Sequence, residues 1–204
     1  MFIITADQVD SRHLDDIAAP TIALLNESFA GELTLPVDRN AGDEIQALVS
    51  LSSTAIAIIG DLTRSGQWSV GCGIGRVRTP LPANTREAAG PGFVAARAAV
   101  DRAKRSALKF ALESETEGEA AHAEALLDLL LLVRSRRTAE GWELFDLVAG
   151  GRTQADAAAI LGISPQAASQ RARAAGIRQE LAALPALAEV LWRVDGAEAH
   201  NGEP

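Results

Sequence analysis

The chain has 204 residues, of which 48% are hydrophobic, and this composition excludes an intrinsically disordered protein. Its formal net charge of -8 excludes a protein that coats nucleic acid through overall charge, but it is compatible with a small DNA-binding domain that uses a local basic patch. One cysteine and three histidines exclude an internal disulfide and a zinc cluster.

Strand and helix signals alternate along the first 112 residues. Strands are predicted at 2–6, 33–37, 45–49, 68–74 and 107–112, and helices at 17–28, 55–62 and 93–104. Turn residues at 40–44 predict a hairpin between the second and third strands. The order β-α-β-β-α-β-α-β predicts an α+β fold, in which an antiparallel-containing sheet carries its helices on one face.

Three glycines, Gly71, Gly73 and Gly75, recur at every second position of the fourth predicted strand and therefore share one face. They indicate that another backbone or a ligand approaches this face closely, and helix-on-sheet packing is one source of such an approach. The glycines do not open a helix, which excludes the dinucleotide-binding fingerprint.

A change of composition separates the first part of the chain from the second. Residues 113–118 are acidic and lack large apolar side chains, so we expect a linker there. Residues 119–194 are predicted to be helical, with segments at 119–136, 142–148, 154–161, 165–174 and 178–192, and the tail 195–204 is expected to fray. The broad apolar stripe of the first segment indicates either a core helix or a dimer contact.

The strongest motif spans residues 153–176. Thr153 is a good cap for a short helix, and Gly162 supplies the positive φ that ends it. Ser164 and Pro165 then begin a second short helix. Alanines on the inner faces let the two backbones approach closely. The sequence therefore predicts two short helices with a tight turn between them.

The outer face of the second short helix carries Gln166, Ser169, Gln170 and Arg173, which are side-chain types that recognise base edges in the major groove. Residues 134–178 hold seven arginines against four acidic residues, which indicates a basic patch for phosphates. The patch comprises Arg134, Arg136, Arg137, Arg152, Arg171 and Arg178 around the outer face. The expected DNA contacts are Thr153, Gln154, Ser164, Gln166, Ser169, Gln170, Arg171, Arg173 and Arg178. A helical hairpin without any ligand is the alternative.

The motif resembles the helix-turn-helix of bacterial regulators and of the promoter-reading region of sigma factors. The resemblance rests on Thr-Gln at 153–154, Ala-x-x-Leu-Gly-Ile-Ser at 158–164 and Ala-Ser-Gln-Arg at 168–171. It implies that the second helix enters the major groove with its N-terminal residues foremost. A single small helix-turn-helix binds DNA weakly, so we expect a homodimer that binds two half-sites on double-stranded DNA.

Acidic residues occur at two sites in the first 112 residues, at the end of the first predicted strand and in the predicted hairpin turn. Asp7 and Asp10 follow the first strand, and Asp43 and Glu44 lie in the hairpin turn. Carboxylates from adjacent strands, together with phosphate oxygens, are a typical Mg²⁺ environment. Solvated turn residues are the ordinary alternative.

Three short segments together resemble the palm domain of class III nucleotide cyclases and diguanylate cyclases: Ala6-Asp7, Gly42-Asp43-Glu44 and the strand at 70–75. The resemblance implies a Mg²⁺ site at Asp7 and Asp43, with Glu44 as a further ligand, and a nucleotide contact from Arg97. Phe93 stands where these cyclases carry an asparagine, so we assign no catalytic residue.

Over the whole chain, segments 5–12, 41–46, 68–71 and 102–105, followed by the helix-turn-helix motif, resemble the SatD family of bacterial proteins. We expect a cytoplasmic DNA-binding transcription regulator whose cyclase-like domain assembles the dimer or senses a nucleotide effector. No apolar run is long enough to span a bilayer and no secretory leader opens the chain, so no membrane contact is expected. The alternatives are a Mg²⁺-dependent nucleotide cyclase or phosphoryl transferase with a targeting module, and a scaffold that binds protein.

Overall fold

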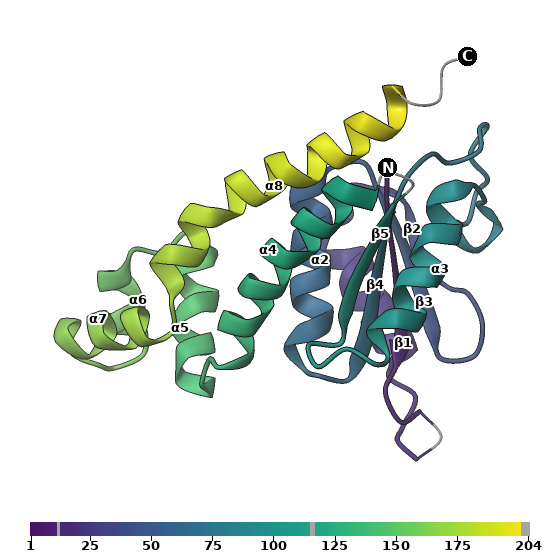
Figure 1. Cartoon of the computed structure of the whole chain (residues 1–204). Helices are drawn as coiled ribbons and strands as arrows, with labels where there is room; N and C mark the ends of the chain where they lie inside the picture. The colour runs from purple at the N-terminus through teal and green to yellow at the C-terminus, as the bar shows by residue number, and fades with distance from the viewer. Residues whose placement is uncertain (12, 115–116, 201–204) are drawn as a thin grey trace. The chain divides into compact units, whose positions relative to one another are not determined.

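The computed structural model describes residues 1–11, 13–114 and 117–200, and Figure 1 shows the chain. The elements follow the order β1 (Phe2–Gln8), α1 (Ala18–Ser28), β2 (Leu33–Arg39), β3 (Glu44–Val49), α2 (Ser52–Arg64), β4 (Trp68–Ile74), η1 (Thr85–Glu87), α3 (Pro91–Ala103), β5 (Phe110–Ser114), α4 (Glu117–Ser135), α5 (Ala139–Ala149), α6 (Gln154–Ile160), α7 (Pro165–Ala174) and α8 (Ile177–His200). Within the described ranges, no helix combines the length and apolar character needed to cross a membrane.

The chain divides into two compact units. The first unit holds residues 1–128 and 187–204, and the second holds residues 129–186. The division falls inside α4 and α8, whereas the sequence placed a linker at 113–118. Residues 113–114 end β5 and α4 begins at Glu117, while 115–116 lie outside the described residues.

The first unit contains a mixed five-stranded sheet in the described part of the chain, with the order β2-β3-β1-β4-β5. The pairs β2–β3, β3–β1 and β1–β4 are antiparallel, and β4–β5 is parallel. The predicted α+β class and the hairpin of β2 with β3 are therefore confirmed. The last strand begins at Phe110 rather than at residue 107, directly after Lys109, whose φ of 55° is incompatible with an extended strand.

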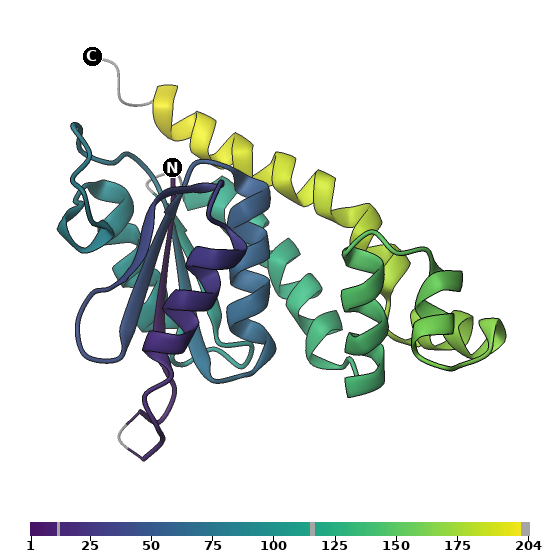
Figure 2. The same cartoon turned by 180° about the vertical axis from the view of Figure 1, so that it is seen from behind.

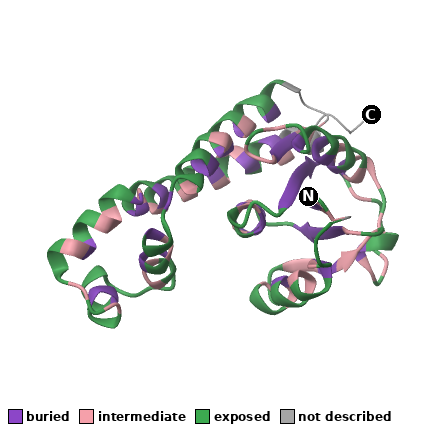
Figure 3. Ribbon diagram, turned by 90° about the horizontal axis from the view of Figure 1, so that it is seen from below, coloured by how far each residue is buried: buried purple, intermediate pink, exposed green. Residues whose placement is uncertain are grey.

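Helices cover both faces of this sheet, so the prediction of helices on one face is wrong. Side chains alternate along β4, and Gly71 and Gly73 face the backbone of α3. Figures 1 and 2 show α3 on one face and α1 and α2 on the other. The physical reason is the double-sided burial of the central strands: every residue of β3 and β4 is buried, as the purple strands in Figure 3 show.

The glycine stripe of β4 is explained by helix packing. A Cβ atom on Gly71 would overlap the backbone of Val100, and one on Gly73 would overlap the backbones of Ala96 and Gly92. Glycine therefore lets α3 lie directly on the strand.

The second unit is built around a small helical core. Its buried members are Leu144, Phe145, Ala157, Ala175 and Ile177. The rings of Trp142 and Phe145 meet edge to face at 5.4 Å between centroids. All five predicted helical segments are present, but α8 continues to His200. Residues 195–200 are thus helical rather than frayed, and residues 201–204 lie outside the described residues.

Candidate nucleic-acid interface

Helix α6 begins and ends where the sequence provides the local signals. The Thr153 hydroxyl accepts a hydrogen bond from the Asp156 backbone N–H at 3.1 Å, which caps the helix. After the helix, Gly162 adopts a φ of 65°, and the Ile163 N–H donates to the Ala158 carbonyl at 3.0 Å. These bonds close the turn at residues 161–164.

Helix α7 starts with its own cap. The Ser164 hydroxyl accepts a hydrogen bond from the Ala167 N–H at 3.1 Å, and Pro165 occupies the first helical position. Ala168 on the inner face is fully buried, as is Ala157 of α6. Small side chains on both inner faces therefore let α6 and α7 pack closely.

The outer face of α7 is open to solvent. Gln166, Ser169, Gln170 and Arg173 are exposed, and their side chains form no hydrogen bond or ion pair with the part of the chain that the structure describes. Amide, hydroxyl and guanidinium groups are thus available together on one side of one helix. Gln154 and Arg178, two further expected contacts, are also exposed, whereas the hydroxyls of Thr153 and Ser164 serve as helix caps.

Arg171 does not share this outer face. Its side chain is half-buried and lies against α5, with Nη1 at 3.5 Å from the Glu140 carbonyl oxygen and 3.7 Å from Glu143 Oε2. The pKa of Glu140 lies below its usual value. The main cause is a hydrogen bond that its carboxylate accepts from its own backbone N–H, followed by one from the Thr138 side chain. The positive charge of Arg171 lowers the pKa of Glu140 further. Arg171 therefore attaches α7 to α5 instead of extending the exposed surface.

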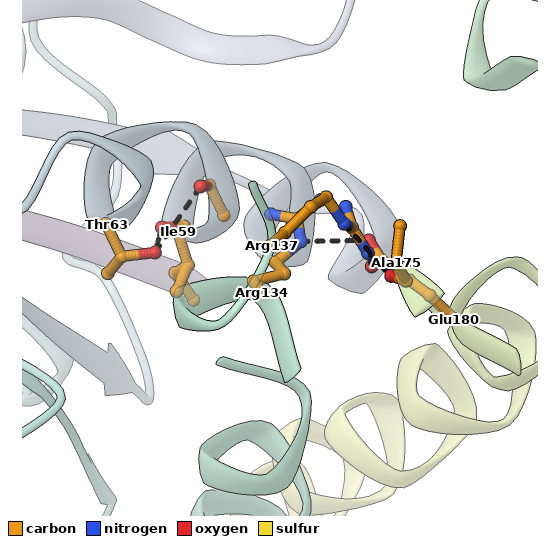
Figure 4. Close-up of polar contacts among 7 residues, drawn as sticks. Ile59, Thr63, Arg134, Arg137, Ala175 and Glu180 are labelled. Carbon is orange, nitrogen blue, oxygen red and sulfur yellow. Dashed lines mark hydrogen bonds and ion pairs between the residues drawn. The ribbon is translucent and has the colours of Figure 1, made fainter. Parts of the chain in front are cut away.

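Two arginines of the expected basic patch point into the second unit, where Arg137 is buried and Arg134 is largely covered (Figure 4). Arg137 Nη2 donates to Glu180 Oε2 at 2.5 Å, and Arg134 Nε donates to Glu180 Oε1 at 2.8 Å. The Arg137 guanidinium also lies over the rings of Trp142 and Phe145, 4.4 Å from each centroid. Arg134 and Arg137 therefore do not belong to the exposed basic surface, because both guanidinium groups are turned toward the buried Glu180 carboxylate.

Glu180 was not among the residues that the sequence singled out. It lies just beyond the segment 134–178 over which the charges were counted, and no local pattern marks it as buried. Four arginines of this segment remain exposed and have no ion-pair partner in the described ranges: Arg136, Arg152, Arg173 and Arg178. The basic surface of this unit is therefore smaller than the sequence indicated.

In the first unit, the structure brings Asp7 and Glu44 together and leaves Asp43 apart. Asp7 and Glu44 are direct partners in the β1–β3 register. Asp43 lines a separate small hollow with Asp16 and Arg39. The three residues expected to bind Mg²⁺ therefore do not converge on one point.

Both paired carboxylates are bound by cations of α3 and its C-terminal end. Asp7 Oδ2 lies 2.9 Å from Lys104 Nζ, and Glu44 Oε1 accepts from Arg97 Nη2 at 2.8 Å. Burial lowers the pKa of Lys104, but the hydrogen bond and charge of Asp7 outweigh it and raise the pKa above its usual value. Within the described residues, no group of three or more His, Cys, Asp or Glu side chains comes together. Asp7 and Glu44 are thus each paired with a cationic side chain of the chain itself.

Comparison of the chain with protein-family models, with curated proteins and with solved structures returns no match.

Proposed function

We propose that the second unit is a helix-turn-helix module that binds double-stranded DNA, and that the chain is a transcription regulator. The observation that carries the proposal is the pair α6 and α7. Each helix is capped by a side-chain hydroxyl, they join through the Gly162 turn, and α7 presents a polar face without internal partners. A helix of this kind fits the major groove and offers glutamine for adenine and arginine for guanine.

The exposed arginines supply the second part of the proposal. Arg152 precedes the start of α6, and Arg178 lies in the first turn of α8. Neither has an ion-pair partner within the described residues, so both are free to contact phosphates. Because the whole chain carries a charge of -8, attraction to DNA must come from this local group rather than from overall charge.

We assign the first unit to assembly or ligand sensing in a homodimer. The antiparallel order β2-β3-β1-β4 supports the resemblance to cyclase palm domains, which share a split β-α-β arrangement. Asp7 and Glu44 already form ion pairs with Lys104 and Arg97, and this favours a regulator over a metal-dependent cyclase. A symmetric dimer would place two copies of α7 on half-sites about 34–36 Å apart.

The decisive experiment is selection from a random-sequence DNA duplex library with the full-length chain, followed by fluorescence anisotropy on the enriched duplex. We expect enrichment of a short, two-fold symmetric sequence. We also expect the logarithm of the binding constant to fall linearly with the logarithm of salt concentration, because phosphate contacts release counterions. The absence of any enriched sequence, together with salt-independent binding, would overturn the proposal.

A further inference from the structure

A large open hollow lies in the first unit, and the proposed function does not use it. Its volume is about 920 Å³, which falls in the range of small-molecule sites. Its walls come from the loop between β4 and α3, from the N-terminal half of α3, and from β3 and β5. The lining residues include Arg78, Arg86, Val94 and Arg97, together with Gln46.

Three arginines line this hollow: Arg78 and Arg86 from the loop between β4 and α3, and Arg97 from α3. Arg78 forms no ion pair with the described residues and is exposed. Arg86 Nε lies 3.5 Å from Asp38 Oδ2, and Arg97 is held by Glu44. The one acidic lining residue, Glu113, already accepts a bond from Arg102 Nε at 2.8 Å. The hollow therefore presents positive charge within a chain that is negative overall.

The loop that carries Arg78 and Arg86 is fixed in place. Thr85 between them is fully buried, and its hydroxyl donates to the Pro36 carbonyl of β2 at 2.6 Å. The Arg78 N–H donates to the Ala89 carbonyl at 2.8 Å, which closes the base of the loop. Arginines on a preorganised loop lose less conformational entropy on binding an anion than arginines on a free segment.

The hollow also has apolar lining residues, which come from α3. Val94, in the first turn of α3, is 72% exposed and therefore available for contact. Phe93 beside it packs against the cluster of Ile3, Leu48 and Ala96 and is held rigidly. Cationic and apolar side chains that line one hollow match a ligand with both characters.

We propose that this hollow binds a small phosphate ester with an apolar body. Arg78 supplies the free charge for the phosphate, Arg97 and Arg86 add further donors, and Val94 contacts the apolar body. A phosphate with three terminal oxygens accepts bonds from several guanidinium forks more fully than a carboxylate does. The proposal does not rest on DNA binding, and its test does not involve DNA.

The test uses 1-naphthyl phosphate as the probe, with titration calorimetry on the full-length chain. We expect saturable binding, which Arg78→Gln weakens by about tenfold or more because a charge-assisted bond is lost. Val94→Ala is expected to weaken this probe by about threefold and to leave the binding of inorganic phosphate unchanged. Arg105→Gln, which removes an exposed charge away from the hollow, is the matched control and should bind as the parent chain does.

Three results would overturn the proposal. The first is the absence of saturable binding at millimolar probe. The second is equal affinity of the parent chain and Arg78→Gln, which would place the probe elsewhere. The third is equal affinity for 1-naphthoate, which would remove the preference for phosphate.

Discussion

Arg137 and Glu180 form a buried ion pair across 43 residues of sequence, with neither side chain exposed to solvent. Arg137 also donates through Nε and Nη2 to the carbonyl of Ala175, the residue that ends α7. One side chain thus joins the C-terminal end of α7 to the first turn of α8. The pair fixes where α7 ends, so it controls the placement of the helix that we propose enters the major groove.

Replacing Glu180 by alanine should destabilise the second unit by about 3–5 kcal/mol, because Arg137 would remain buried without a counter-charge and Arg134 would lose its partner. The loss should appear as faster amide hydrogen exchange in peptides from α5, α6 and α7. Glu189→Ala is the matched control, since Glu189 pairs with Arg193 on an exposed face, and it should change stability by less than about 1 kcal/mol. Equal protection in the Glu180 variant and the parent chain would contradict this role.

The sequence predicted both ends of α7 correctly, but it did not predict which of the surrounding arginines are exposed. The difference has a physical origin. Ser164, Pro165 and Gly162 act through bonds within a few residues, so their effect can be derived from neighbouring positions. Whether Arg137 faces solvent depends on Glu180, which lies far along the chain and approaches only after folding. Counting charges over a segment does not distinguish a phosphate contact from a buried pair.

Gly73→Ala should prevent the first unit from folding or cost it at least about 3 kcal/mol. The new methyl group would overlap the backbones of Ala96 and Gly92, and backbone atoms of α3 have no side-chain freedom with which to move aside. Urea unfolding followed by circular dichroism measures the loss.

Gly31→Ala is the control for that substitution, because a Cβ at Gly31 meets nothing within 4 Å. Gly31→Ala should change the free energy of unfolding by no more than about 0.5 kcal/mol, as an ordinary surface substitution does. If the Gly73 variant unfolds at the same urea concentration as the Gly31 variant, then α3 does not pack on β4 as described.

The Cys72 thiol should be unreactive in the folded chain. Burial raises its pKa from 9.0 to about 12, so almost no thiolate is present at pH 8.5. A chromogenic disulfide reagent should therefore label the thiol only as fast as the first unit unfolds. Labelling of the native chain within seconds would contradict the buried position.

The same shift predicts a pH dependence of stability. Between pH 9 and about 12 the unfolded thiol loses its proton while the folded thiol keeps it, so the free energy of unfolding falls as pH rises. Below pH 9 both states are protonated and this group contributes no slope. The parent chain should therefore lose stability relative to Cys72→Ala above pH 9, by up to about 1.4 kcal/mol per pH unit. Parallel pH profiles for the two chains would contradict the shift.

The residues that were expected to bind Mg²⁺ show that a local sequence pattern does not determine which side chains come together in the fold. Asp43 and Glu44 are consecutive in the sequence, and Asp7 is predicted to lie near them because its strand was expected to neighbour the hairpin. In the structure, Glu44 is the first residue of β3 and pairs with Asp7 of β1, whereas Asp43 lies in the turn before β3 and lines a separate hollow. The cations that bind these two carboxylates are Arg97, which the sequence indicated only as a nucleotide contact, and Lys104, which it did not assign to this site.

Arg173 and Arg152 should affect DNA binding in different ways. Arg173 lies on the exposed face of α7, so Arg173→Ala should weaken binding to the selected duplex by about 1–3 kcal/mol and relax the preference at one base pair. Arg152 lies outside that face, before α6, so Arg152→Ala should weaken binding to all duplexes alike and reduce the salt slope by about one. Anisotropy titrations on the selected duplex and on single-base variants separate the two effects. Arg105→Ala removes the same charge from the first unit and should bind as the parent chain does; a uniform loss in all three variants would mean that net charge, and not α7, governs the interaction.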